Sequence, residues 1–186
     1  MENNMNISPK RKVLSGARAI ALVGITAATV ECAKLALAAL PNIEIITLLI
    51  GLYGYVFGWY GVLASLVFVS IEPLIYGFGT WVISYYIYWP LVAFTFMLLG
   101  RLKVRNRWLL TLTALLLTFF FGILTSLVDV GLLTGNFNRF FYRFGIYYVR
   151  GIIFYALQLS CNAVIFPLAF NFLARKLDAI KRQFFK

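Results

Sequence analysis

The chain consists largely of apolar runs that approach the roughly 20 residues needed to cross the hydrocarbon core of a membrane. Hydrophobic residues make up 62% of its 186 positions and charged residues 12%, with a mean hydropathy of +0.89, which excludes an ordinary soluble domain. A chain of this length has room for about six such runs joined by short connections. We therefore predict an all-α integral membrane protein with six transmembrane helices and no separate soluble domain.

Turn signals separate these runs. Pro41 ends the first run, Asn42 can cap the next helix, and the Pro- and Gly-containing stretch 73–79 predicts a short turn at a membrane surface. The predicted helices cover residues 15–39, 43–57, 60–75, 80–99, 108–133 and 145–174. They form a substrate-binding domain, 15–174, between a cytoplasmic N-terminal segment, 1–14, and a cytoplasmic basic tail, 175–186. The second and third helices are short for spans, so they stand upright, thin the bilayer or lie partly inside the bundle.

The positive charges predict the orientation of the bundle. Basic clusters at 10–18, 101–107 and 175–186 fall on connections that share one side of the membrane, which places both termini in the cytoplasm. The net charge of +11 collects at helix ends in this way, so it does not call for a nucleic acid partner. A basic start followed by an apolar run also resembles a signal peptide, but Glu31 and Lys34 interrupt the run.

The sequence lacks the residues that several kinds of catalytic and metal-binding site require. The chain has no histidine, which removes the commonest general base and metal ligand. Cys32 and Cys161 both lie inside apolar segments, and no phosphate-binding G-x-x-x-x-G-K-[ST] loop occurs. We expect no enzyme, no catalytic residue, no metal site, no cofactor and no nucleotide hydrolysis by this chain.

An aromatic segment follows the predicted surface turn 73–79. Trp81, Tyr85 and Tyr88 are spaced i, i+4 and i+7, and Trp89 lies beside them, so these rings share one helix face. Such a face just below a surface turn predicts the wall of a binding pocket. The alternative is an aromatic belt that faces lipid.

The next two helices each carry a polar stripe whose residues are spaced 4, 3 and 4 positions apart. These polar groups either line a pocket or hydrogen-bond between helices and hold them together. The stripes are Thr118, Gly122, Thr125 and Asp129 on one helix, and Gly151, Tyr155, Gln158 and Asn162 on the other.

Charges inside membrane spans are costly and usually functional. Glu31 and Lys34 lie three residues apart near the outer end of the first helix, so we predict a local ion pair or a lysine that snorkels to the membrane surface. We place Glu44 and Glu72 at outer helix ends, where contact with water makes a carboxylate inexpensive.

These faces and the outer connections converge on one half of the membrane, and we predict a single binding site there. An enzyme that uses Glu72 and Asp129 as acid and base, or an assembly factor without a ligand, are the alternatives from other classes. The predicted site residues are Asn42, Glu72, Trp81, Tyr85, Asp129, Asn138, Tyr148, Tyr155 and Gln158.

The first helix carries small residues at spacings of 4, 3 and 4, namely Ala17, Ala21, Gly24 and Ala28, which lets another helix approach closely. This segment (ARAIALVGITAA), together with LPNIEIITLLIGLYGYVFGW and IEPLIYGFGTWVISYYIYWP, resembles the substrate-binding S-components of energy-coupling factor (ECF) transporters. The resemblance covers nearly the whole chain.

The resemblance implies a protein of the bacterial plasma membrane that binds a vitamin from outside. It would then associate with a transmembrane coupling protein and two ATPase subunits, which supply the ATP hydrolysis. The family's Ala-xxx-Ala docking signature matches Ala17 and Ala21, and Gly24 and Ala28 extend that face. Cobalamin is the first expected ligand, and pantothenate, folate and riboflavin remain open.

Overall fold

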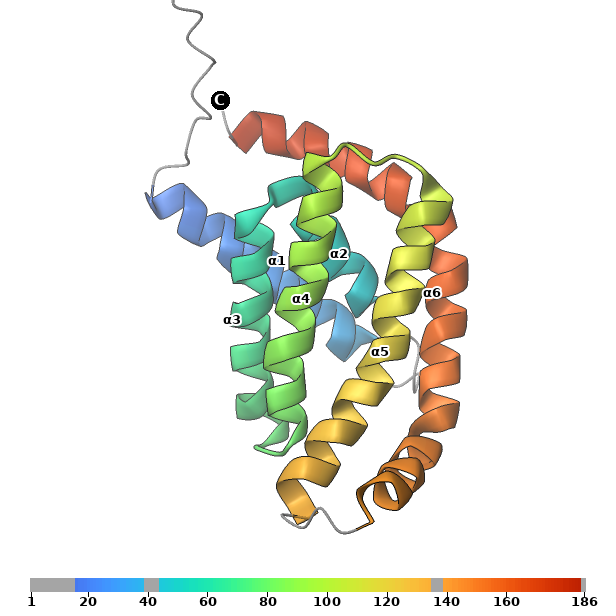
Figure 1. Cartoon of the computed structure of the whole chain (residues 1–186). Helices are drawn as coiled ribbons and strands as arrows, with labels where there is room; N and C mark the ends of the chain where they lie inside the picture. The colour runs from blue at the N-terminus through green and yellow to red at the C-terminus, as the bar shows by residue number, and fades with distance from the viewer. Residues whose placement is uncertain (1–15, 39–43, 135–138, 185–186) are drawn as a thin grey trace, which may run out of the picture.

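The computed structural model describes residues 16–38, 44–134 and 139–184, which form six α-helices and no strand (Figure 1). Five of these helices are long and apolar enough to cross a membrane, and α2 is shorter. The expected all-helical fold is therefore present, with five candidate spans. The helices are α1 (Gly16–Ala36), α2 (Ile46–Phe57), α3 (Trp59–Tyr76), α4 (Trp81–Arg101), α5 (Arg107–Thr134) and α6 (Phe140–Phe184).

Helix α2 is the centre of the bundle. Its 12 residues extend about 18 Å, well short of the ~30 Å hydrocarbon thickness. Ten of them are buried, and α2 contacts each of the other five helices. Of the three outcomes expected for a short apolar helix, the structure has the one in which the helix lies inside the bundle.

Helices α2 and α4 pack with their backbones in contact. A Cβ atom added to Gly54 would lie 2.1 Å from the carbonyl oxygen of Ala93, and one added to Gly100 would lie 2.3 Å from that of Tyr55. Only glycine allows this approach. On the far side of this contact, Phe96 packs against Phe170 of α6 with ring centroids 5.3 Å apart, so the core continues across three helices.

The turn between α3 and α4 is shorter than the sequence predicts. Helix α3 continues through Pro73 to Tyr76, so the predicted turn at 73–79 is wrong in its first half. The helix ends at Gly77 instead, whose φ of 81° leaves the helical region and whose N–H donates to the Pro73 carbonyl at 3.0 Å. A proline inside an apolar helix is tolerated when the surrounding protein compensates for the lost hydrogen bond, and Pro73 is buried.

Helix α4 ends in a hydrogen-bonded C-terminal turn. The N–H groups of Lys103 and Val104 donate to the carbonyls of Gly100 (3.1 Å) and Leu99 (3.0 Å), the pattern of a Schellman motif. Lys103 takes the left-handed position, with φ of 55°, where glycine is usual. The Tyr55 hydroxyl donates to the Val104 carbonyl at 2.7 Å, which ties the connection to α2.

Helix α6 is longer than predicted at both ends. The prediction was a helix at 145–174 followed by a basic tail, whereas the helix covers 45 residues, or roughly 65–70 Å. Its last part bends and runs across the end of the bundle (Figure 1). Leu177 packs against the core, and Arg182 pairs with Asp178 one turn earlier at 2.9 Å, so this segment is a helix that lies on the bundle rather than an extended tail.

Candidate ligand-binding site

The aromatic segment of α4 forms the predicted inward face. The Trp81 and Tyr85 ring centroids lie 5.1 Å apart, those of Tyr85 and Trp89 lie 5.7 Å apart, and Tyr88 contacts Trp89 at 4.8 Å. Tyr88 and Trp89 are buried, whereas Trp81 and Tyr85 are half-buried. Tyr86 points outward and is exposed. Four rings thus form a wall inside the bundle, and a belt facing lipid would not bury them.

Rings on α5 and α6 continue this wall. Tyr85 contacts Phe121 of α5 with centroids 6.1 Å apart. On α6, the Tyr155 hydroxyl lies 3.1 Å from that of Thr125 on α5, and the Tyr148 and Tyr155 rings lie 5.5 Å apart. Tyr85 and Tyr155 thus both contact α5, through Phe121 and Thr125 respectively, and Tyr148 packs against Tyr155.

The ion pair near the outer end of α1 differs from the prediction. Lys34 pairs with Glu72 of α3 rather than with Glu31. Glu72 is 1% exposed, so its placement at a water-exposed helix end is also wrong. The physical reason is that α3 continues for another turn beyond Glu72, which keeps the carboxylate between α1 and α3. The Lys34 ammonium lies 4.4 Å from the ring centroid of Tyr76 and 5.6 Å from that of Tyr85, so the pair adjoins the aromatic wall.

Glu31 is a second buried carboxylate in this region. It is 7% exposed, and its nearest charged neighbours are Glu72 and Lys34. The Glu31 and Glu72 carboxyl groups are close enough for a hydrogen bond between them when one is protonated, and no N–H or other O–H group of the described residues donates to Glu31. The cluster therefore holds two acids and one ammonium beside aromatic rings, with hydrogen-bonding capacity left over.

A second polar cluster lies around Glu44, just before the start of α2. The Thr47 N–H donates to Glu44 Oε1 at 3.3 Å, as does the Thr47 hydroxyl, and Asn162 Nδ2 donates to Glu44 Oε2 at 3.4 Å and to the Thr118 hydroxyl at 3.0 Å. The Tyr88 hydroxyl lies beside Thr47 and Thr118. Glu44 is 8% exposed, which corrects its predicted place at a wet helix end. Because α2 begins inside the bundle, Glu44, two residues before it, is inside as well.

The helices of these clusters carry further buried polar atoms that lack a hydrogen-bond donor or acceptor among the described residues. Leaving such an atom unsatisfied costs about 1–3 kcal/mol, so several of them in one bundle call for an explanation. They come from four helices, and Gln158 lies one turn from Asn162 on α6. The unpartnered atoms are both carboxylate oxygens of Glu31, Glu72 Oε1, Ser84 Oγ, Trp89 Nε1, Gln158 Oε1 and Asn162 Oδ1.

The remaining predicted site residues divide into two groups. Asp129 is half-buried and accepts a hydrogen bond from the Thr80 hydroxyl, which places it beside the start of α4. Asn42 and Asn138 lie outside the described residues. Within the described ranges, no three His, Cys, Asp or Glu side chains are grouped closely enough to hold a metal ion.

The predicted site residues left out several contributors to this region, among them Glu31, Lys34, Glu44 and Ser84. A signal was present for the first two, since a charge inside an apolar helix is costly and usually has a function. Ser84 lies four residues before Tyr88, on the same helix face. Glu44 carries no such signal, because a glutamate just after a Pro-Asn pair has the pattern of a surface turn.

The predicted docking face of α1 lies on the outside of the bundle. Ala17, Ala21, Gly24 and Ala28 are all exposed, and a Cβ atom added to Gly24 would meet nothing within 4 Å. The opposite side of α1 packs on the core through Ala27 and other buried residues. The small residues therefore do not serve packing within the described bundle.

Searches of protein-family models, of curated proteins and of solved structures find no match to this chain. The likeness to S-components therefore rests on the sequence motifs.

Proposed function

We propose that this protein binds a vitamin-sized molecule within the membrane and serves as the specificity subunit of an ATP-driven importer of the ECF type. The observation that carries the proposal is the set of buried, unpartnered polar atoms on α1, α3, α4 and α6 beside the aromatic wall. A ligand that forms hydrogen bonds with several of these atoms would satisfy groups that the described side chains leave without a partner.

The composition of the site favours a ligand with both an extended apolar surface and many polar groups. The rings of Trp81 and Tyr85 present a stacking surface, while the amides of Gln158 and Asn162 offer hydrogen bonds. Cobalamin is the first candidate, followed by pantothenate, folate and riboflavin.

The arrangement of the helix ends supports a cytoplasmic location for both termini in a bacterial plasma membrane. The start of α1, the basic α4–α5 connection and the basic last turns of α6 lie at one end of the bundle, and the α3–α4 turn lies at the other (Figure 1). Basic residues mark the cytoplasmic end of a membrane protein. In this orientation the α3–α4 turn and the start of the aromatic wall face the outside, from which an importer takes up its substrate.

The exposed small-residue face of α1 supports docking on a membrane-embedded coupling protein, with ATP hydrolysis in two partner ATPases. Ala21→Trp should block the close helix approach and abolish transport, while leaving ligand binding by the isolated protein intact. Ile153→Trp is the matched control, because Ile153 is 73% exposed on α6, away from this face. Equal loss of transport and binding in Ala21→Trp would refute the docking role.

The two alternatives receive less support. An acid–base enzyme would need the carboxylates of Glu72 and Asp129 to act together, but Glu72 pairs with Lys34 and Asp129 accepts from Thr80. An assembly factor without a ligand would not need Tyr88 and Trp89 to be turned into the bundle.

A binding panel tests the proposal. The purified protein is titrated with cyanocobalamin, pantothenate, folate and riboflavin, and Trp81→Ala is compared with Trp108→Ala. Trp108 is a suitable control because it is 63% exposed at the start of α5, at the opposite end of the bundle. We expect one of the four compounds to bind the parent and the control with equal affinity and Trp81→Ala several-fold more weakly. Binding of none of them to the parent, or equal binding to Trp81→Ala, would contradict the proposal.

A further inference from the structure

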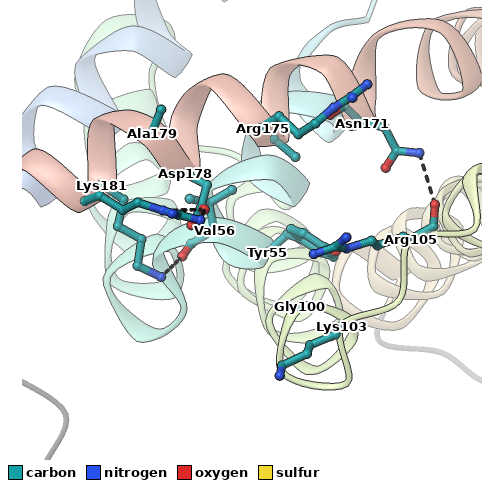
Figure 2. A pocket seen from close by; sticks show the side chains of 12 residues that line it. Tyr55, Val56, Gly100, Lys103, Arg105, Asn171, Arg175, Asp178, Ala179 and Lys181 are labelled. Atoms are coloured by element: carbon teal, nitrogen blue, oxygen red, sulfur yellow. Dashed lines mark hydrogen bonds and ion pairs between the residues drawn. The ribbon is translucent and has the colours of Figure 1, made fainter.

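A separate cavity of about 700 Å³ lies at the other end of the bundle, away from the α3–α4 turn (Figures 1 and 2). Its walls come from the last turn of α2, the end of α4 with the α4–α5 connection, and the segment of α6 that crosses the bundle end. None of the residues assigned to the ligand site above lines it.

The cavity is strongly cationic. Its lining holds five basic side chains and one carboxylate: Lys103, Arg105, Arg175, Lys181, Arg182 and Asp178. The carboxylate pairs with Arg182 at 2.9 Å. Within the described ranges, Lys103, Arg105 and Arg175 have no carboxylate within ion-pairing distance. Three cations of one cavity therefore remain uncompensated by acidic side chains.

Two hydrogen bonds from α6 hold the walls of the cavity together. Asn171 Nδ2 donates to the Arg105 carbonyl at 3.1 Å, which joins α6 to the α4–α5 connection. The Arg175 Nε donates to the Asn171 carbonyl at 3.1 Å, so the arginine is held while its terminal nitrogens extend further. In Figure 2 the Arg105 side chain extends from the connection towards Tyr55. Lys103, Arg105 and Arg175 are exposed to solvent, and they line the cavity together with the half-buried Asn171 and the buried Ala174.

One of the cavity-lining residues, Lys103, has an unusual backbone conformation. Lys103 adopts the left-handed conformation, with φ of 55°, at a helix C-terminus where glycine is the usual residue. A side chain there is disfavoured, and Lys103 is one of the residues that line the cavity.

From this geometry we propose that the cavity binds a phosphate-bearing group. Arginine offers paired N–H donors that match phosphate oxygens, and several cations together balance a doubly charged group. Basic pockets between helices on the cytoplasmic side of a membrane are suited to anionic headgroups. The phosphate belongs to a membrane lipid headgroup or to a soluble phosphate compound, and the inference does not depend on the proposed vitamin-binding function.

Two arms of one experiment separate these sources. The purified protein is incubated with dioleoyl-phosphatidylglycerol or with phosphate-free dioleoylglycerol, and lipid adducts are counted by native mass spectrometry. In the second arm, binding of inorganic pyrophosphate to the delipidated protein is measured by calorimetry. The variants are Arg105→Gln and Arg175→Gln. Lys176→Gln is the control, since Lys176 is the neighbour of Arg175 with the same charge but does not line the cavity.

We expect Arg105→Gln and Arg175→Gln each to reduce occupancy about tenfold or more, because each removes charge-assisted hydrogen bonds, and Lys176→Gln to leave it unchanged. Specific retention of phosphatidylglycerol identifies the lipid as the source, and pyrophosphate binding alone identifies a soluble compound. Arg175→Lys, which keeps the charge and the fold, should lower occupancy less than Arg175→Gln. Absence of both ligands from the parent, or an equal loss in Lys176→Gln, would overturn the proposal.

Discussion

Replacing Gln158 by methionine should raise the stability of the empty protein and weaken its ligand binding. Gln158 is 8% exposed, and its Oε1 is buried without a hydrogen-bond partner among the described residues. Methionine fills a similar volume without a polar oxygen, so the variant loses an unsatisfied group that costs about 1–3 kcal/mol. At about 2–4 °C per kcal/mol for a domain of this size, the unfolding midpoint should rise by several degrees.

The binding effect has the opposite sign. If the ligand donates a hydrogen bond to this amide oxygen, its loss costs about 1–3 kcal/mol, or roughly five- to more than hundred-fold in affinity. A residue with a purely structural role would not show a gain in stability together with a loss of affinity.

The assay pairs thermal unfolding in detergent with titration of cyanocobalamin, followed by the other three vitamins. Leu157→Met is the control, because Leu157 is the preceding residue and is 43% exposed on the outer side of α6. This variant should behave like the parent in both measurements. A Gln158→Met variant that is less stable than the parent and binds the ligand equally well would refute the reasoning, because the amide would then stabilise the bundle itself.

Three further predictions concern the fold. Gly54→Val should lower the unfolding midpoint by many degrees or prevent folding, since even its Cβ would lie 2.1 Å from the Ala93 carbonyl oxygen. Lys34→Met should destabilise the protein by about 3–5 kcal/mol in chemical denaturation by leaving Glu72 buried and unpaired, and adding Glu72→Gln should restore most of the loss. In a background without the native cysteines, Val104→Cys should react with an impermeant thiol reagent only from the cytoplasmic side, and labelling from outside would refute the proposed orientation.

The long helices could be predicted from the sequence because their signals are local. Apolar runs of about 20 residues, a Gly-rich turn and basic clusters fix where a chain crosses a membrane. The inward aromatic face of α4 was predictable for the same reason, because the spacing of Trp81, Tyr85 and Tyr88 encodes one side of a helix.

The partners of the buried charges could not be predicted in this way. Lys34 is three residues from Glu31, yet it pairs with Glu72, 38 positions away, because helix packing and not sequence distance decides which side chains meet. Glu44 followed the pattern of a surface turn, but the short α2 draws it into the bundle, where it accepts from Asn162. These contacts between side chains of different helices depend on where each helix begins and ends. The amino-acid composition of a segment does not determine those positions.

The cationic cavity also escaped the sequence reasoning. From the sequence, its basic residues indicate only which side of the membrane a connection occupies, which is the common role of arginine and lysine at helix ends. What distinguishes them is that α6 continues past residue 174 and bends across the bundle, which brings Arg175 opposite Lys103 and Arg105. A helix bend of this kind leaves little trace in the sequence beyond Pro167.

Native mass spectrometry of the purified protein tests the central claim most directly. The parent is released from detergent after incubation with cyanocobalamin, pantothenate, folate and riboflavin, alongside Trp81→Ala and Gln158→Met. The account predicts one bound vitamin per chain in the parent and a clear loss of that adduct in both variants, with Trp108→Ala unaffected. A parent that carries none of these compounds, or variants that retain the same adduct at the same occupancy, would contradict it.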